Sequence, residues 1–260
     1  MTKIFVSPSS QEANVVGSYV EETAMNMIAD ILCPELTRHG IEWMRNSRGD
    51  TYKGHIEKSN LYKPDYHVAI HSNATGRESN TNIRGTEVYC AHPETSTSLG
   101  TQLARKVYRK LSELTPVIDR GILSAVGKLS EVMYTKAPAI LMEVDFHDNA
   151  EGAEWIMNNI EPIAHAILLG ILEQIGVAYI EPPKPVQSGI IYRVQIGAFS
   201  ILTNAENYLD RIKLAGFPAF IKKDGQWYRI QVGAFTVRAN ADRYMEQVKR
   251  AGFDCFIAKT

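Results

Sequence analysis

The C-terminal part of the chain contains an internal repeat, which limits the possible folds more than any other feature of the sequence. Residues 192–200, Tyr-Arg-Val-Gln-Ile-Gly-Ala-Phe-Ser, return 36 residues later as residues 228–236, Tyr-Arg-Ile-Gln-Val-Gly-Ala-Phe-Thr. Each copy is typical of a strand, a helix and a second strand. Two copies cannot form an open solenoid, which needs three or more. The repeat therefore predicts a small α+β domain, a duplicated βαβ unit with one sheet and two helices on one face.

A proline-rich segment separates this repeat from the rest of the chain. Residues 181–189, Glu-Pro-Pro-Lys-Pro-Val-Gln-Ser-Gly, begin with three prolines in five positions. Such a composition favours an extended, semi-rigid spacer. The sequence therefore predicts a larger domain over residues 1–180, a linker over 181–189 and a small domain over 190–260.

The larger domain alternates between patterns typical of buried strands and of amphipathic helices. Strands are expected at residues 3–7, 40–44, 65–70, 84–90 and 137–144. Helices are expected at residues 19–37, in the polar stretch ending near Asn60, and at 98–114 and 150–176. This alternation predicts an α/β fold with a mainly parallel sheet covered by helices on both faces.

Composition excludes several classes of partner. The formal net charge is −1, so no overall basic field indicates nucleic acid or anionic lipid. The three cysteines form no CxxC pair, and we interpret them as reduced and structural. No apolar run reaches the roughly 20 residues that a membrane span needs. No membrane insertion is expected, and the sequence does not indicate an oligomeric state.

His71 is the first candidate site residue. It follows the apolar run Val68-Ala-Ile70, where the predicted strand ends, and Ser72, Asn73 and Ala74 after it are small. Ligands of open α/β sheets gather at the carboxyl ends of strands. His67 lies on the same strand face but about 13 Å away along the strand, too far to share a metal ion. Taken alone, His71 is more often a buried structural histidine than a ligand.

Glu143 and Glu21 are the candidate acids. Glu143 interrupts the apolar run Ile140-Leu-Met-Glu-Val144. A buried carboxylate costs several kcal/mol unless it is paired or bound to a metal. The alternative is a salt bridge to a basic residue on a neighbouring strand. Glu21 and Glu22 begin a predicted helix, where acids are usually solvated and favoured by the helix dipole.

Taken together, these segments resemble the zinc-dependent N-acetylmuramoyl-L-alanine amidase family. The segments that carry the resemblance are His71-Ser-Asn-Ala74, Gly85-Thr-Glu-Val88, Arg120-Gly121, Leu141 to Asn149, and Glu21 followed by Ile28-Ala29. The resemblance covers roughly residues 1–176. It implies a phosphorylase/hydrolase-like fold, a zinc ion held by Glu21 and His71, substrate contacts from Asn73, and Glu143 as the catalytic carboxylate. Glu22 remains the alternative to Glu21, one residue away.

The chain departs from this family at one point. The family commonly has a metal-binding histidine in a Pro-Gly-His-Gly turn after the first strand, whereas this chain has Pro8-Ser-Ser-Gln11. Zinc prefers histidine, cysteine and carboxylate ligands to an amide. We propose the side-chain oxygen of Gln11 as the third ligand, with water or His147 as alternatives. For His147 we favour a structural role.

The small domain resembles the sporulation-related repeat, or SPOR domain, a peptidoglycan-binding module with a ferredoxin/RNP-like fold. The two Arg-x-Gln-x-Gly-Ala-Phe strands carry the resemblance. Within them Gln195 and Gln231 lie on a polar face that should be free of helices. These residues are either a solvent-exposed strand face or, as the resemblance implies, a platform whose amides bind sugar hydroxyls.

The resemblances imply a peptidoglycan hydrolase. A metal-activated water would cleave the amide bond between N-acetylmuramic acid and the L-alanine of the stem peptide. The alternatives are a non-catalytic wall-binding protein with a degenerate site, and another zinc hydrolase of peptidoglycan, such as a deacetylase or peptidase. No basic-then-apolar leader opens the chain. We therefore expect synthesis in the cytoplasm without a signal peptide and action on the bacterial wall after release, as for a phage endolysin or, alternatively, a mother-cell autolysin.

Overall fold

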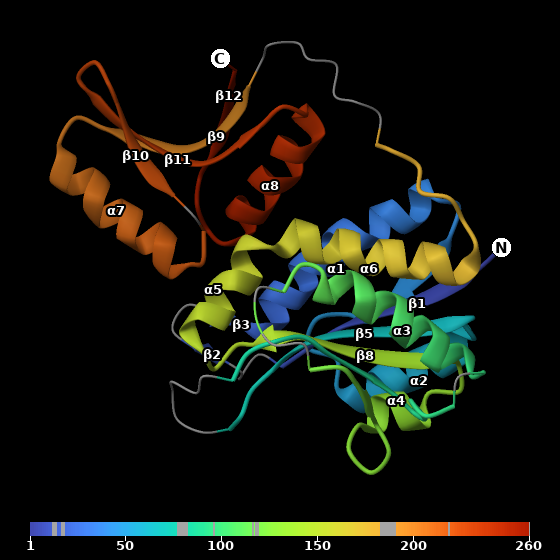
Figure 1. Cartoon of the computed structure of the whole chain (residues 1–260). Helices are drawn as coiled ribbons and strands as arrows, with labels where there is room; N and C mark the ends of the chain where they lie inside the picture. Colours follow the sequence, from blue (N-terminus) through green and yellow to red (C-terminus); the bar gives the residue numbers. More distant parts are fainter. Residues whose placement is uncertain are drawn as a thin grey trace. The chain divides into compact units, whose positions relative to one another are not determined.

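A computed structural model describes most of the chain in two compact units, residues Met1–Ile180 and Glu181–Thr260 (Figure 1). The described residues are 1–11, 15–16, 19–76, 83–95, 97–115, 117, 120–182, 191–217 and 219–259. Most of the predicted linker, from residue 183 onward, lies outside the described residues. So do residues 12–14, in the polar loop expected after the first strand.

The first unit is built on a six-stranded sheet with the order β4-β1-β5-β8-β6-β7. Its strands are β1 (Lys3–Pro8), β4 (Glu42–Arg45), β5 (Tyr66–Asn73), β6 (Glu87–Cys90), β7 (Ile122–Ser124) and β8 (Ala139–Phe146). Strands β4, β1, β5 and β8 are parallel, β6 runs antiparallel to β8, and β7 is parallel to β6. A separate short pair consists of β2 (Val15–Val16) and β3 (Tyr19–Val20). The predicted mainly parallel sheet is confirmed.

Helices cover both faces of this sheet (Figure 1). They are α1 (Glu21–Arg38), α2 (Tyr52–Tyr62), α3 (Leu99–Ser112), α4 (Ser130–Tyr134), α5 (Ala150–Asn158) and α6 (Ile160–Ile175). Val68 and Ile70 of β5 face the large core formed with α1, α3 and α6. Ala69, between them, faces a smaller cluster that includes Val132 of α4. This alternation follows from the two-residue period of a strand.

Two elements differ from their predicted extents. Strand β5 continues to Asn73. His71 therefore lies inside the strand, two residues before its end, and not at the start of a loop. The expected helix over residues 150–176 is two helices, α5 and α6, bent by 72° at Asn159. Pro162 explains the break, because its ring clashes with the carbonyl of residue 158 and it cannot donate a hydrogen bond to that carbonyl. No single helix among the described residues is long and apolar enough to span a membrane.

The second unit is a four-stranded antiparallel sheet with the order β10-β11-β9-β12. Its elements are β9 (Tyr192–Phe199), α7 (Leu202–Leu214), β10 (Phe220–Asp224), β11 (Trp227–Phe235), α8 (Arg238–Arg250) and β12 (Phe256–Lys259). Val194 and Ile230 of the two central strands share a core with Ile212 of α7 and Val248 of α8. Both helices therefore pack on the same face, as the repeat predicts.

Candidate active site

Three ionisable side chains form a row across the sheet of the first unit. In the strand pairing, His71 of β5 lies opposite Glu143 of β8, and Glu143 lies opposite Glu87 of β6. Residues directly opposite one another on neighbouring strands share a sheet face. The row lies toward the carboxyl ends of β5 and β8, where the sequence places His71 and Glu143. Glu87 was not singled out from the sequence, although it belongs to the Gly85-Thr-Glu-Val88 segment.

Glu21 meets His71 from the first turn of α1. Its Oε1 lies 3.1 Å from His71 Nδ1, and its side chain is fully buried. The adjacent Glu22 points elsewhere, because its Oε1 accepts a hydrogen bond of 2.9 Å from the backbone N–H of Gly49. Of the two neighbouring acids, the structure thus brings Glu21 to the site.

The other ring nitrogen of His71 faces a carboxylate that the sequence did not indicate. Nε2 of His71 lies 3.7 Å from Oε2 of Glu131, a residue of the short helix α4. Burial disfavours the imidazolium, but Glu131 and Glu21 outweigh burial and hold the pKa of His71 well above its usual range. Three histidines, His55, His67 and His71, likewise outweigh burial at Glu131 and hold its pKa well below its usual range.

Glu143 is a partly buried acid, and its Oε2 is shielded from solvent and unsatisfied. Its Oε2 has no hydrogen-bond partner within the described part of the chain. The salt bridge to a basic residue on a neighbouring strand, considered from the sequence, is not among the ion pairs of these residues. The pKa of Glu143 is raised to about 8, chiefly by burial and also by the charges of Glu21 and Glu87, while His71 acts in the opposite direction. Such a carboxyl can both accept and donate a proton near neutral pH.

Glu87 anchors a polar network beside this acid. Arg120 forms an ion pair with Oε1 of Glu87. The hydroxyl of Tyr89 and the side-chain N–H of Asn73 donate to Oε2 of Glu87 at 2.8 and 3.1 Å. Oδ1 of Asn73 accepts from the backbone N–H of Ala74 at 2.8 Å. Asn73, predicted to contact substrate, is therefore held at the edge of the row by both ends of its amide.

The remaining metal candidates are Gln11 and His147. Gln11 is exposed, and its backbone N–H donates to the Oγ of Ser9 at 3.2 Å. His147 is buried, where its Nδ1 lies 2.9 Å from the Oγ of Ser72 and its ring stacks on Tyr19 at 5.4 Å. These contacts give His147 a packing role.

The chemistry of the donors at Glu21 and His71 fits a zinc ion. Imidazole nitrogen and carboxylate oxygen are zinc donors, and Oε1 and Nδ1 are close enough to bind one cation. A cation there would also offset the buried negative charge of Glu21, Glu143 and Glu87. No group of three or more histidine, cysteine or acidic side chains within the described ranges is arranged to hold a metal. The described residues thus offer two protein donors of these types.

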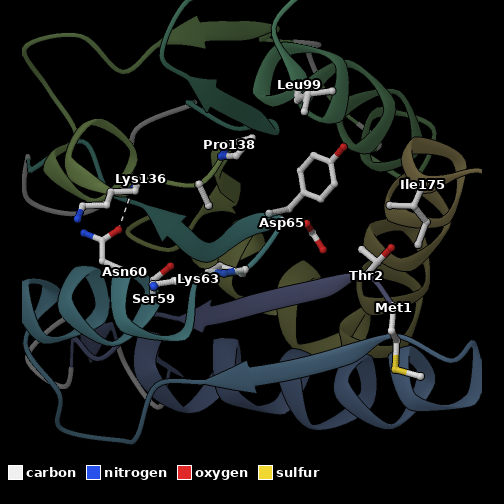
Figure 2. A pocket seen from close by; sticks show the side chains of 13 residues that line it. Met1, Thr2, Ser59, Asn60, Lys63, Asp65, Leu99, Lys136, Pro138 and Ile175 are labelled. Atoms are coloured by element: carbon white, nitrogen blue, oxygen red, sulfur yellow. Dashed lines mark hydrogen bonds between the residues drawn. The ribbon is translucent and has the colours of Figure 1, made fainter.

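A prominent hollow of the first unit lies away from this site. A cavity of about 830 Å³ is lined by Met1, Asp65, Tyr66 and Pro138, among others (Figure 2). These residues precede or begin β1, β5 and β8, whereas His71 and Glu143 lie near the other ends of the parallel strands. None of the predicted site residues lines this cavity.

The candidate residues of the second unit lie on the central strands of its sheet. Gln195 of β9 lies directly opposite Gln231 of β11, on the face away from the helices. They are only 9% and 4% exposed, so the expectation of a solvent-exposed polar face is wrong for them. Each has a neighbouring strand on both sides, which leaves little of its side chain open. Phe220 lies opposite Gln231, and Phe256 opposite Gln195, both about half exposed.

Comparison with protein families divides the chain in the same place. A family model described as N-acetylmuramoyl-L-alanine amidase matches residues 9–173, and one described as SPOR domain matches residues 188–259. A curated relative, the sporulation-specific N-acetylmuramoyl-L-alanine amidase of Bacillus subtilis (strain 168), is 25% identical over 231 residues. The match covers 85% of this chain and 84% of that protein.

Solved structures share the fold of the first unit. The catalytic domain of an N-acetylmuramoyl-L-alanine amidase from Bacillus (Paenibacillus) polymyxa var. colistinus is 23% identical, with a TM-score of 0.59 over 68% of this chain and 100% of that one. An N-acetylmuramoyl-L-alanine amidase from Clostridium difficile 630 is 22% identical, with a TM-score of 0.58 over 67% of this chain and 97% of that one. At these identities the likeness shows a common fold.

Proposed function

This chain belongs to the N-acetylmuramoyl-L-alanine amidase family, and we propose that Glu143 is the carboxyl group that moves protons in its reaction. The resemblance inferred from the sequence is confirmed for both units, and with it the amidase activity and the SPOR domain. The substrate is peptidoglycan, which the SPOR domain binds. The observation that carries the proposal is the carboxylate of Glu143, whose Oε2 is shielded from solvent and unsatisfied, opposite His71 on the neighbouring strand.

The family is generally zinc-dependent, and Glu21 and His71 are the residues that would hold the ion. An ion held by these two residues would supply Lewis-acid chemistry, lowering the pKa of a water molecule and polarising the carbonyl of the scissile amide. The third donor is the side-chain oxygen of Gln11 or a water molecule. Zinc content after dialysis against a mild chelator separates the two. Loss of zinc from Gln11→Ala, intermediate between wild type and His71→Ala, supports the amide, and wild-type zinc content excludes it.

The side chains around the ion have separate roles in proton transfer and substrate orientation. Oε2 of Glu143 accepts a proton from the attacking water, and the same group delivers it to the nitrogen of L-alanine as the amide bond breaks. Its raised pKa suits both steps near neutral pH. Glu87 holds Arg120 and Asn73 next to this acid, where their polar groups can orient the glycan-peptide chain.

Digestion of purified peptidoglycan tests the assignment of Glu143. We expect wild-type protein to open the bond between N-acetylmuramic acid and L-alanine, as seen by mass analysis of the products. Glu143→Gln should lose roughly 10²- to 10⁴-fold in rate while still binding walls. Glu22→Gln is the matched control, because this buried acid contacts Gly49 and not the site. Near-normal hydrolysis by Glu143→Gln would refute the role, and a different opened bond would identify a deacetylase or peptidase.

For the second unit we propose a glycan-binding row across the open face of the sheet. Phe220, Gln231, Gln195 and Phe256 follow one another across the four strands, and the order is symmetric because both pairs are related by the 36-residue repeat. The amides of the central glutamines bind sugar hydroxyls, while the half-exposed rings pack against sugar faces. Phe220→Ala with Phe256→Ala should weaken sedimentation with insoluble peptidoglycan. Arg243→Ala on the exposed face of α8 should not, and equal binding by both variants would contradict the row.

A further inference from the structure

A buried polar cluster lies beneath the site, on the sheet face that α2 and α4 cover. We define the polar cluster as Ser7 of β1, His55 and Ser59 of α2, His67 of β5 and Glu131 of α4. All five side chains are buried, none of them more than 5% exposed. The same sheet face is apolar nearby, at Ala69, Leu141 and Val132. Apolar side chains could fill this space equally well, so packing alone does not explain the polar cluster.

Glu131 is the centre of the polar cluster. Its Oε1 accepts a hydrogen bond from Ser7 and lies 3.0 Å from His67 Nε2 and 3.4 Å from His55 Nδ1. Its Oε2 faces His71 Nε2 at 3.7 Å. One carboxylate thus meets three imidazole rings. His67 and His71, four residues apart on one strand face, meet the two oxygens of the same carboxylate.

The two supporting histidines are each held at both ring nitrogens. The Nδ1 of His67 lies 3.0 Å from the Oγ of Ser59. The Nε2 of His55 lies 2.9 Å from the side-chain nitrogen of Asn46 and 3.2 Å from the Oγ of Ser10. Partners from three different elements, β1, α2 and β5, therefore fix the carboxylate of Glu131 in place. Because the Glu131 carboxylate is fixed by these partners, it can orient a further imidazole ring that contacts it.

His71 is the ring that Glu131 can hold. Its Nδ1 meets Glu21, while its Nε2 has no hydrogen-bond partner within the described ranges and faces Glu131. A neutral histidine has one N–H, and the group that accepts this proton decides which nitrogen keeps its lone pair. Histidines that bind metals usually donate their second N–H to a carboxylate or carbonyl, which orients the ring.

We propose that Glu131 is a positioning residue for His71: when zinc is bound, it would keep the ring proton on Nε2 and leave the Nδ1 lone pair for the ion held beside Glu21. His55, His67 and Ser7 serve by holding Glu131. Burying so many polar groups is costly, and an apolar core of similar volume is often as stable or more stable. The polar cluster therefore stabilises one orientation of the imidazole. The proposal rests on the proposed function only in giving His71 a ligand role.

The test compares Glu131→Gln with the matched control Glu22→Gln. Glu131→Gln keeps the size of the side chain and removes its charge, while Glu22 is equally buried but has no contact with His71 among the described residues. The first readout is the pair of ¹⁵N chemical shifts of the His71 ring in zinc-loaded protein, which report which ring nitrogen carries the proton. The second is zinc affinity by chelator competition. The third is kcat and KM on peptidoglycan fragments.

We expect Glu131→Gln to shift the His71 resonances toward a mixture of tautomers and to weaken zinc binding about 10- to 100-fold. It should lower kcat with little change in KM, whereas Glu22→Gln matches wild type in all three. If Glu131→Gln does not fold, as judged by circular dichroism, His55→Gln provides a milder test. It removes one support of Glu131 and should move the same resonances in the same direction, by less.

Two outcomes would overturn the proposal. Wild-type resonances and zinc affinity in Glu131→Gln would make the polar cluster purely structural. Loss of zinc as complete as in His71→Ala would make Glu131 a ligand and not a positioning residue. A wild-type protein without amidase activity would refute the proposed function, yet the His71 resonances of the variants would still report on Glu131. The two failures are therefore distinguishable.

Discussion

At the residue scale, the site gathers more buried negative charge than its one imidazole can balance. Glu21 and Glu131 flank the ring of His71, and Glu143 and Glu87 follow it across the sheet. Three histidines stabilise the ionised form of Glu131, but Glu143 has no such support: burial raises its pKa, and its Oε2 is unsatisfied. Sites that need such groups commonly give up stability to keep them.

Glu143→Gln should therefore stabilise the metal-free protein at the same time as it removes activity. The pKa of this carboxyl is about 8 in the folded state and near 4.5 when unfolded, so the folded state resists losing the proton. Below pH 4.5 both states are protonated and the acid adds no pH-dependent term. As the pH rises from about 4.5 to 8 the unfolded state ionises first, and the wild-type protein loses stability.

The measurement is urea unfolding of wild-type protein and Glu143→Gln in the presence of a chelator, at pH 4.5 and pH 8.5. The advantage of the variant in free energy of unfolding should grow between these values by an amount on the order of a few kcal/mol. A difference that stays constant with pH would show that burial does not disfavour the ionised form of Glu143.

At the scale of elements, α6 lies unusually close to α3 because of one glycine. A Cβ atom built on Gly170 of α6 would lie 2.6 Å from the Cα of Val107 in α3. Real Cβ contacts are almost never so short, and the obstructing atom is backbone, which cannot turn aside. These two helices help to form the core behind the parallel strands. Their spacing therefore affects the strands that carry His71 and Glu143.

Gly170→Ala should destabilise the first unit by about 1–3 kcal/mol, the usual cost of overpacking. Alanine is the better helix former by about 1 kcal/mol, so propensity alone predicts the opposite sign. Gly54→Ala in α2 is the control, because its Cβ would meet Thr51 at an ordinary 3.6 Å. Thermal unfolding should show a lower Tm for the first variant and an equal or higher Tm for the second. Equal shifts would mean that the close approach of α3 and α6 is not limiting.

Much at this scale follows from the sequence, since the period of apolar residues depends on local chain geometry. The strands around His71 and Glu143, and the helix that begins at Glu21, were expected near their observed places. The pairing of Glu143 with both His71 and Glu87 was not, because register between strands depends on the whole sheet. Glu131 was missed because α4 has five residues, too few for a helical period to be visible.

The choice between Glu21 and Glu22 also could not be made from the sequence pattern. The two acids are adjacent at the start of one helix, and sequence spacing alone separates them by a single residue. The structure separates them by about a quarter of a helical turn, which sends Glu21 to His71 and Glu22 to Gly49. A similar limit applied to Gln195 and Gln231, whose burial depends on which strands flank theirs.

At the scale of the whole molecule, the chain joins an enzyme unit to a binding unit, and each has its own core. The large core takes residues no later than Tyr179, and the core of the second unit takes none before Tyr192. Units with separate cores are expected to fold independently. Limited proteolysis should therefore cut first within residues 181–189, and both fragments should keep their circular dichroism spectra. Loss of structure in the fragment of residues 1–180 would show that the units depend on each other.

The joined units should act on an insoluble wall more effectively than the enzyme unit alone. Binding by the SPOR domain keeps the amidase near its polymer, so the second encounter becomes intramolecular and the effective concentration rises. We expect a chain that ends at residue 180 to hydrolyse insoluble peptidoglycan at least about tenfold more slowly at low enzyme concentration. On soluble glycan-peptide fragments, which offer no second attachment point, its kcat and KM should equal those of the full chain.

The chain of residues 1–260 with Phe220→Ala and Phe256→Ala serves as the control for truncation, because it removes the proposed contacts and keeps the length. If both altered proteins match wild type on insoluble walls, the second unit does not deliver the enzyme to its substrate. If both are slow even on soluble fragments, the second unit acts on the chemistry of the first.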